Sequence, residues 1–172
     1  TNIKAEKLEI KGEGDFVGGV AGYIPWANYN TETKVSNLVV KDSKISGYKY
    51  VGGIIGYGKI KNMESINNHV VGIDCVGGIS GNTFQTHGKV AVEDSIIEGT
   101  GNYIGGIAGF SNAVQKVRVN NTEVYGGSYT GGIVGYAYRV YNSKIENSEI
   151  LSTGNIIGGI VGHGRSRMFS CY

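Results

Sequence analysis

The residues of this sequence best suited to chemistry are three histidines, two cysteines and a few carboxylates. The histidines are His69, His87 and His163, and none lies within four residues of another. Zinc peptidases carry two histidines on one helix face in the pattern H-E-x-x-H. That pattern is absent from these 172 residues. We therefore expect no metal site and no peptidase centre in this segment.

Paired carboxylates are a second possibility, because glycoside cleavage uses two acidic side chains that flank the scissile bond. The only aspartates are Asp15, Asp42, Asp74 and Asp94. Asp42 and Asp94 occupy one position of the repeat described below, two units apart, and Asn67 holds that position between them. Stacked units would place the two carboxylates roughly 10 Å apart, just beyond the range for an inverting pair. This position is more typical of a turn built by Asp and Asn side chains.

Two further signals favour structure over chemistry. The segment GGIIGYGK at Gly52–Lys59 is similar to a phosphate loop, but Ile60 follows the lysine where Ser or Thr is required. Cys75 replaces an apolar residue of the repeat, which predicts a packed thiol and not a nucleophile. Cys171 falls about four units further along, too far for a disulfide. We predict no catalytic residue and no cofactor.

Most of the glycine in this sequence belongs to a repeat. Glycine makes up 30 of the 172 residues, against a usual share of roughly 7%. The block VGGVAGY recurs as VGGIIGY, VGGISGN, IGGIAGF, TGGIVGY and IGGIVGH at intervals of 34, 25, 28, 26 and 27 residues. Each copy holds three glycines, so the copies account for 18 of the 30: Gly18, Gly19, Gly22, Gly52, Gly53, Gly56, Gly77, Gly78, Gly81, Gly105, Gly106, Gly109, Gly131, Gly132, Gly135, Gly158, Gly159 and Gly162.

A short alternating segment precedes the glycine block in each unit, as in VVKDSKISG at 39–47 and RVNNTEVYG at 118–126. Units of about 27 residues cannot bury a hydrophobic face alone, but stacked units can pair equivalent strands in parallel. The sequence therefore predicts an all-β protein, a right-handed parallel β-solenoid of about six coils with three short strands each. The usual crossover rule supplies the handedness. We expect one domain over residues 1–172, a slice of a longer rod, with residues 24–34 as a projecting loop.

Alignment of the units predicts which side chains form the core. The residues two positions after the first glycine are Val20, Ile54, Ile79, Ile107, Ile133 and Ile160. Stiff β-branched side chains stacked in register are suited to a narrow solenoid core. We expect each glycine pair to form a corner without room for a Cβ atom, and the third glycine to leave space for a neighbouring side chain.

Aromatic residues recur in two further columns that the strand alternation places on the outside or at corners. We select Tyr23, Tyr57 and Tyr136, together with Trp26 from the extra segment, as a candidate ligand surface. Exposed tyrosine faces can bind sugars or a protein partner. The alternative is that the rings only stack on each other or lie beneath a neighbouring domain.

Blocks of the form xxVGGIxGY, each after a short Val/Ile-rich strand with Asn or Asp turns, resemble the GLUG motif of bacterial surface and secreted proteins. The resemblance covers about residues 7–163, and residues 165–172 resemble the start of a further unit. It implies membership of large extracellular proteins, such as adhesin-like proteins and the N-terminal regions of immunoglobulin-A-cleaving metallopeptidases. It implies a repeat type and does not specify an activity.

Composition limits the partners. A net charge of +2 is too small to indicate nucleic acid binding, and no apolar run is long enough for membrane insertion. We expect a non-catalytic module of a secreted or cell-surface bacterial protein, serving as an adhesion or binding element or as a rigid spacer. Its expected partners are a host protein or glycan and other domains of the same chain. The alternatives are an accessory domain of a large extracellular metallopeptidase and a carbohydrate-binding or carbohydrate-cleaving β-helix.

Overall fold

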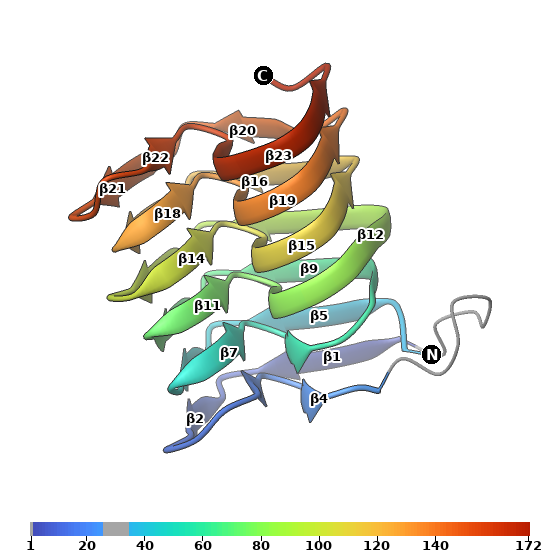
Figure 1. Cartoon of the computed structure of the whole chain (residues 1–172). Helices are drawn as coiled ribbons and strands as arrows, with labels where there is room; N and C mark the ends of the chain where they lie inside the picture. The colour runs from blue at the N-terminus through green and yellow to red at the C-terminus, as the bar shows by residue number, and fades with distance from the viewer. Residues whose placement is uncertain (1, 26–34) are drawn as a thin grey trace.

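The chain winds into a stack of coils built entirely from parallel strands. The computed structural model describes residues 2–25 and 35–172, and these residues form 23 strands and no helix. Each strand pairs with its equivalent in the coils before and after it (Figure 1). The first strands lie at one end of the stack and the last strands at the other. The predicted parallel β-solenoid is confirmed.

Each coil has three sides, and each side belongs to one sheet. The first six-stranded sheet contains β2 (Glu9–Lys11), β6 (Lys44–Ser46), β10 (His69–Gly72), β13 (Ile96–Gly99), β17 (Glu123–Gly126) and β21 (Glu149–Ser152). The second contains β3 (Val17–Gly18), β7 (Lys49–Gly52), β11 (Asp74–Gly77), β14 (Asn102–Gly105), β18 (Ser128–Gly131) and β22 (Ile157–Gly158). One strand from every repeat unit thus enters each of these two sheets.

The third side is longer, and its strands form an 11-stranded sheet. We number the coils by their glycine blocks. In the third coil this side is one continuous strand, β12, whereas in the second coil it is divided into β8 and β9. Its members are β1 (Ile3–Glu6), β4 (Ala21–Tyr23), β5 (Leu38–Lys41), β8 (Ile55–Tyr57), β9 (Ile60–Ile66), β12 (Ser80–Glu93), β15 (Ala108–Gln115), β16 (Val117–Asn120), β19 (Val134–Tyr141), β20 (Lys144–Glu146) and β23 (Val161–Phe169).

The core is a spine of stacked Val and Ile side chains. Val76 pairs in register with Val51 on one side and Ile104 on the other, and all three are fully buried. The predicted isoleucine column is also fully buried through the four middle coils, as Ile54, Ile79, Ile107 and Ile133. The two end coils depart, because each is covered on one side only in the structure: Val20 and Ile160 of this column are partly buried, and Ile157 of the last coil is 50% exposed.

The glycine pairs permit close approach between backbones, as predicted. A Cβ atom at Gly52 would lie 2.1 Å from the Ile55 carbonyl oxygen, and one at Gly53 would lie 2.2 Å from the Gly78 carbonyl oxygen. Our expectation for the third glycine is wrong. A Cβ atom at Gly81 would lie 2.3 Å from the Tyr50 carbonyl carbon, so the space holds neighbouring backbone and no side chain. The second and third sheets therefore meet backbone to backbone beside this glycine.

The polar column forms the predicted turn ladder. Its members share a left-handed backbone with φ between +47° and +51°, a conformation that Asn and Asp tolerate. The Asn67 amide donates to Asp42 at 2.6 Å, and the Asn121 amide donates to Asp94 at 2.7 Å. Both candidate carboxylates are thus bonded to an asparagine of the next coil. The column consists of Asp42, Asn67, Asp94, Asn121 and Asn147.

Candidate functional site

Two columns of aromatic rings run side by side along the outside of the solenoid, and we call them together the aromatic face. The first column rises from the second sheet as Phe16, Tyr50, Tyr103 and Tyr129, and the second rises from the third sheet as Tyr23, Tyr57, Phe110 and Tyr136. Rings of one column stack at centroid distances such as 5.0 Å for Phe16–Tyr50 and 4.8 Å for Phe110–Tyr136. Rings of different columns meet edge to face, as Phe16 does with Tyr23 at 5.4 Å.

An unusual backbone conformation positions the first column. Tyr50 and Tyr103 have φ of 53° and 62°, and the equivalent residues of other coils are similar. Left-handed bulky residues within strands are rare and cost roughly 1–2 kcal/mol each. A local irregularity of this kind re-aims a side chain. The third glycine of the repeat packs against this same backbone, which explains why no side chain is tolerated there.

Both columns lose their ring in the same coil. Cys75 and Asn82 occupy the third-coil positions, where the register places Asn82 between Tyr57 and Phe110. A cavity of about 470 Å³ opens at this place, and we call it the ring gap. Its lining consists of Lys49, Tyr50, Asp74, Cys75, Asn82, Asn102, Tyr103 and Phe110.

Polar groups surround the ring gap. Asp74 Oδ1 accepts hydrogen bonds from the Asn102 backbone N–H at 2.6 Å and from its side-chain amide at 3.3 Å. The Lys49 ammonium lies 5.0 Å from the centre of the Tyr50 ring. Burial raises the pKa of Cys75 to about 12, so the group is a neutral thiol at physiological pH. Cys75 is 6% exposed and free, which confirms the predicted packed thiol.

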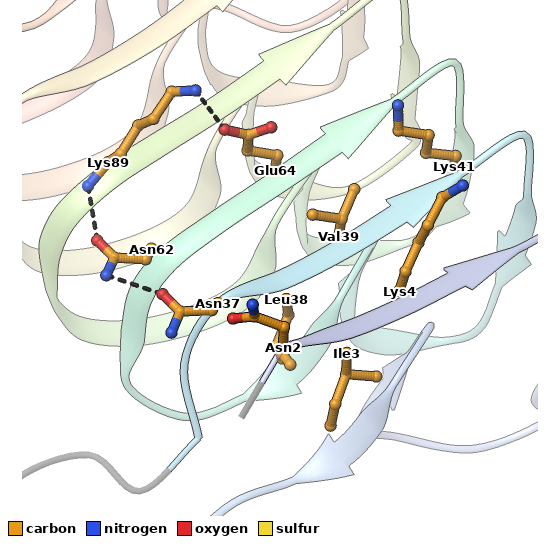
Figure 2. Close-up of a pocket in the computed structure, with 10 residues that line it drawn as sticks. All are labelled: Asn2, Ile3, Lys4, Asn37, Leu38, Val39, Lys41, Asn62, Glu64 and Lys89. Carbon is orange, nitrogen blue, oxygen red and sulfur yellow. Dashed lines mark hydrogen bonds and ion pairs between the residues drawn. The ribbon is translucent and has the colours of Figure 1, made fainter.

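A second hollow lies on the outer side of β1, β5, β9 and β12 (Figure 2). Its volume is about 660 Å³. The polar side chains around it bind one another: Asn62 donates to Asn37 at 3.0 Å and accepts from the Lys89 N–H at 2.9 Å, and the Lys89 ammonium pairs with Glu64 at 2.5 Å. No aromatic ring of the described residues lines this hollow, so it lies apart from the aromatic face.

Acidic side chains elsewhere pair with nearby bases. Glu146 contacts Lys144 at 2.6 Å, and His69 contacts Glu98 at 3.1 Å. His163 stacks on Tyr136 at 5.2 Å, whereas His87 lies in another part of the fold, where partial burial lowers its pKa. Among residues 2–25 and 35–172, no three His, Cys, Asp or Glu side chains come together as a metal site.

The predicted ligand residues lie in two groups. Tyr23 and Tyr57 stack on each other at 5.2 Å, while Tyr136 belongs to the ring stack beyond the gap. Trp26 and most of the predicted loop 24–34 lie outside the described residues. The observed stacking agrees with the alternative interpretation, in which the rings only stack on each other. The ring gap with its polar residues Lys49, Asp74, Asn82 and Asn102 was not predicted from the sequence, although the paired departures at Cys75 and Asn82 are visible in the alignment.

Comparison with known proteins gives one structural likeness. No family model matches the chain. No curated protein matches it by search either. The fold is similar to the crystal structure of a Bacteroides ovatus protein provisionally identified as an immunoglobulin A1 protease, with a TM-score of 0.64 and 19% identity. The similarity covers 96% of this chain and 56% of that one, so the chain spans about half the length of this relative. At this identity the likeness shows a shared fold.

The part of the chain that the structure describes includes no helix of the length and apolarity needed to cross a membrane.

Proposed function

We propose that this chain is a non-catalytic β-solenoid module of a bacterial protein that is secreted or displayed on the cell surface. It acts as a binding element carried on a stiff rod, and the aromatic face is its binding surface. The resemblance of the glycine blocks to GLUG repeats supports the extracellular setting. The fold shared with a Bacteroides protein supports a bacterial one.

One observation carries the proposal: the repeated residues other than the aromatic ones already have structural roles. Val and Ile fill the core, the glycines allow close backbone contact, and the Asp and Asn column bonds coil to coil. The aromatic columns lie on the outside of the coils, where Phe16 and Tyr23 of the first coil are 37% and 55% exposed and the rings of the later coils are partly buried. A partly exposed aromatic surface on a rigid scaffold is typical of recognition.

The charged groups support a non-catalytic role. Acid–base catalysis requires groups that converge on one substrate position. Here the closest acid–base pairs, such as Glu64 with Lys89 and Glu146 with Lys144, lie along the outer faces of the coils. Asp42 and Asp94 of the turn ladder each accept a hydrogen bond from an asparagine side chain of the next coil.

A bead assay tests the proposal. Beads coated with the purified chain should be retained on mucin or on epithelial cells more than albumin-coated beads, and replacing Tyr57 and Tyr136 by Ala should reduce retention. Replacing Lys4 by Ala, outside the aromatic face, is the matched control. Release of cleaved product from immunoglobulin A1 or from polysaccharide by the chain alone would overturn the proposal. Equal retention of wild type and albumin beads would leave only the spacer role.

An accessory role in an extracellular protease is the second candidate, and the fold likeness to the Bacteroides ovatus protein favours it. The partners would then include other domains of the same chain. Ile157, Met168 and Phe169 of the last coil are 50–58% exposed and offer an apolar surface on which such a domain could pack. Removing this module from a protease that carries it should raise KM for immunoglobulin A1 and leave kcat unchanged. An unchanged KM would contradict the accessory role.

A further inference from the structure

We propose that the ring gap binds one neutral pyranose ring of a saccharide, held between the aromatic rings of the coils above and below. The assignment rests on the proposed binding function and gives its ligand class. The gap is a built feature of the aromatic face, because both columns are interrupted in one coil and the space between them is open. Its volume of about 470 Å³ is in the usual range for a small-molecule site.

The height of the gap fits one inserted ring. Consecutive rings of the columns stack at 4.8–5.2 Å, and the gap coil contributes none. Tyr50 and Tyr103 stand two coils apart, which is about 10 Å at the usual strand spacing. Cys75 lies between them and is 6% exposed, so a ligand ring would lie outside the thiol with one of these tyrosines on each side.

The walls favour the C–H faces of a sugar. Aromatic rings have a negative face, and the axial C–H bonds of a pyranose carry the complementary partial positive charge. Tyr103 and Phe110 form one wall and Tyr50 another. These rings are fixed by their own stacking partners, for example Tyr129 on Tyr103 at 5.1 Å. The site is thus preorganised, which reduces the cost of binding.

The rim favours hydroxyl groups. Asn82 and Asn102 each carry donor and acceptor atoms, Asp74 accepts and Lys49 donates. A ligand that displaces water from these groups must replace the lost hydrogen bonds. A sugar edge does so with hydroxyls that both donate and accept, whereas the edge of a phenyl ring does not. The opposite charges of Lys49 and Asp74 balance, which favours a neutral ligand over an anionic one.

Titration of the intact ¹⁵N-labelled chain tests the assignment. The probes are the methyl glycosides of glucose, galactose and N-acetylglucosamine, with N-acetylphenylalaninamide as the aromatic competitor. We expect at least one glycoside to shift the amide signals of Asp74, Cys75, Asn82 and Asn102. A dissociation constant on the order of 1 mM is expected for a ligand of this size.

Variants that complete the ring columns give the sharpest control. The neighbouring coils carry Tyr50 with Tyr57 and Tyr103 with Phe110 at these positions, so Cys75→Tyr with Asn82→Tyr fills the gap with residues of the kind the fold already accepts. Binding should fall at least tenfold without a loss of thermal stability, and Asn82→Tyr alone should do the same if the double variant does not fold. Asn82→Ala should weaken binding severalfold. Lys4→Ala, on β1 outside the aromatic face, should leave binding within twofold.

Three results would overturn the assignment: no glycoside shifts at tens of millimolar with the protein folded, shifts that persist when the gap is filled, or binding of the phenylalanine amide alone. The last result would identify an aromatic side chain of a protein partner as the ligand. None of these would by itself refute a non-catalytic surface module, because that proposal is tested by bead retention and product release.

Discussion

Replacing Gly78 by Ala tests how tightly the coils are stacked. Gly78 is the second glycine of the third block, and an added methyl would lie 2.4 Å from the Gly106 carbonyl oxygen of the next coil. It would also lie 2.9 and 3.0 Å from the two methyl carbons of Val92. The oxygen belongs to backbone and the valine is stiff, so neither can move aside cheaply. The coils must separate locally to admit the methyl.

The expected cost is that of overpacking a close-packed interior, about 3 kcal/mol. For a chain of this length, each kcal/mol lowers Tm by roughly 2–4 °C, so the variant should melt about 6–12 °C below wild type. Backbone strain does not contribute, because φ at Gly78 lies outside the left-handed region. The whole effect should therefore come from contact between coils.

Gly159→Ala is the matched control. Gly159 holds the same repeat position in the last block, but an added methyl there meets no atom within 4 Å. Its free energy of unfolding should change by less than about 0.5 kcal/mol. Thermal melts followed by circular dichroism, with urea titrations alongside, compare the two variants. Equal losses at Gly78 and Gly159 would refute the reasoning, because the glycines would then be required for backbone conformation and not for stacking.

Three further predictions concern side chains. Asn68→Ala should lower the free energy of unfolding, measured in urea, by about 3 kcal/mol, because it removes the hydrogen-bond partners of two buried backbone groups of the preceding coil. Asn67→Ala, on the exposed ladder, should lower it by less than about 1 kcal/mol. The pKa of Cys75 is raised by burial from 9.0 to about 12, so this thiol should resist DTNB in the native state and react in urea. Its contribution to stability should be complete below pH 9 and lost as pH rises toward 12. A hydrogen bond to Glu123 raises the pKa of Tyr125 to about 12. In a titration followed by tyrosinate absorbance at 295 nm, Glu123→Gln should move the last tyrosine transition to lower pH. Tyr125→Phe should remove that transition.

The register of the sheets could be predicted from the sequence because the fold repeats. In a stack of equivalent coils, aligning two units in sequence is the same operation as pairing their strands. The alignment that places Val76 beside Val51 and Ile104 is the observed hydrogen-bond register. The turn ladder of Asp42 and Asn67 could be predicted for the same reason.

The arrangement within a coil could not be predicted in this way. Strand alternation distinguishes inside from outside, but it does not say how closely two sides of a coil approach each other. Gly81 contacts the Tyr50 backbone because Tyr50 adopts a left-handed conformation, which no rule for bulky residues in strands would predict. The ring gap was not predicted because its residues come from five strands, β7, β11, β12, β14 and β15, and only the fold brings them together.

Because the coils are equivalent, the third coil can be compared directly with its neighbours. A ring at Cys75 or Asn82 would extend an existing stack, and aromatic pairs contribute about 0.5–1.5 kcal/mol beyond the area they bury. The third coil lacks that stabilisation at both positions, although its core residues Val76 and Ile79 are as fully buried as those of its neighbours. No packing requirement on the outer face replaces the missing rings, because a cavity remains there. Departures from a locally favourable pattern without a structural gain are typical of functional sites. On physical grounds the third coil is therefore where a ligand for this rod should be sought.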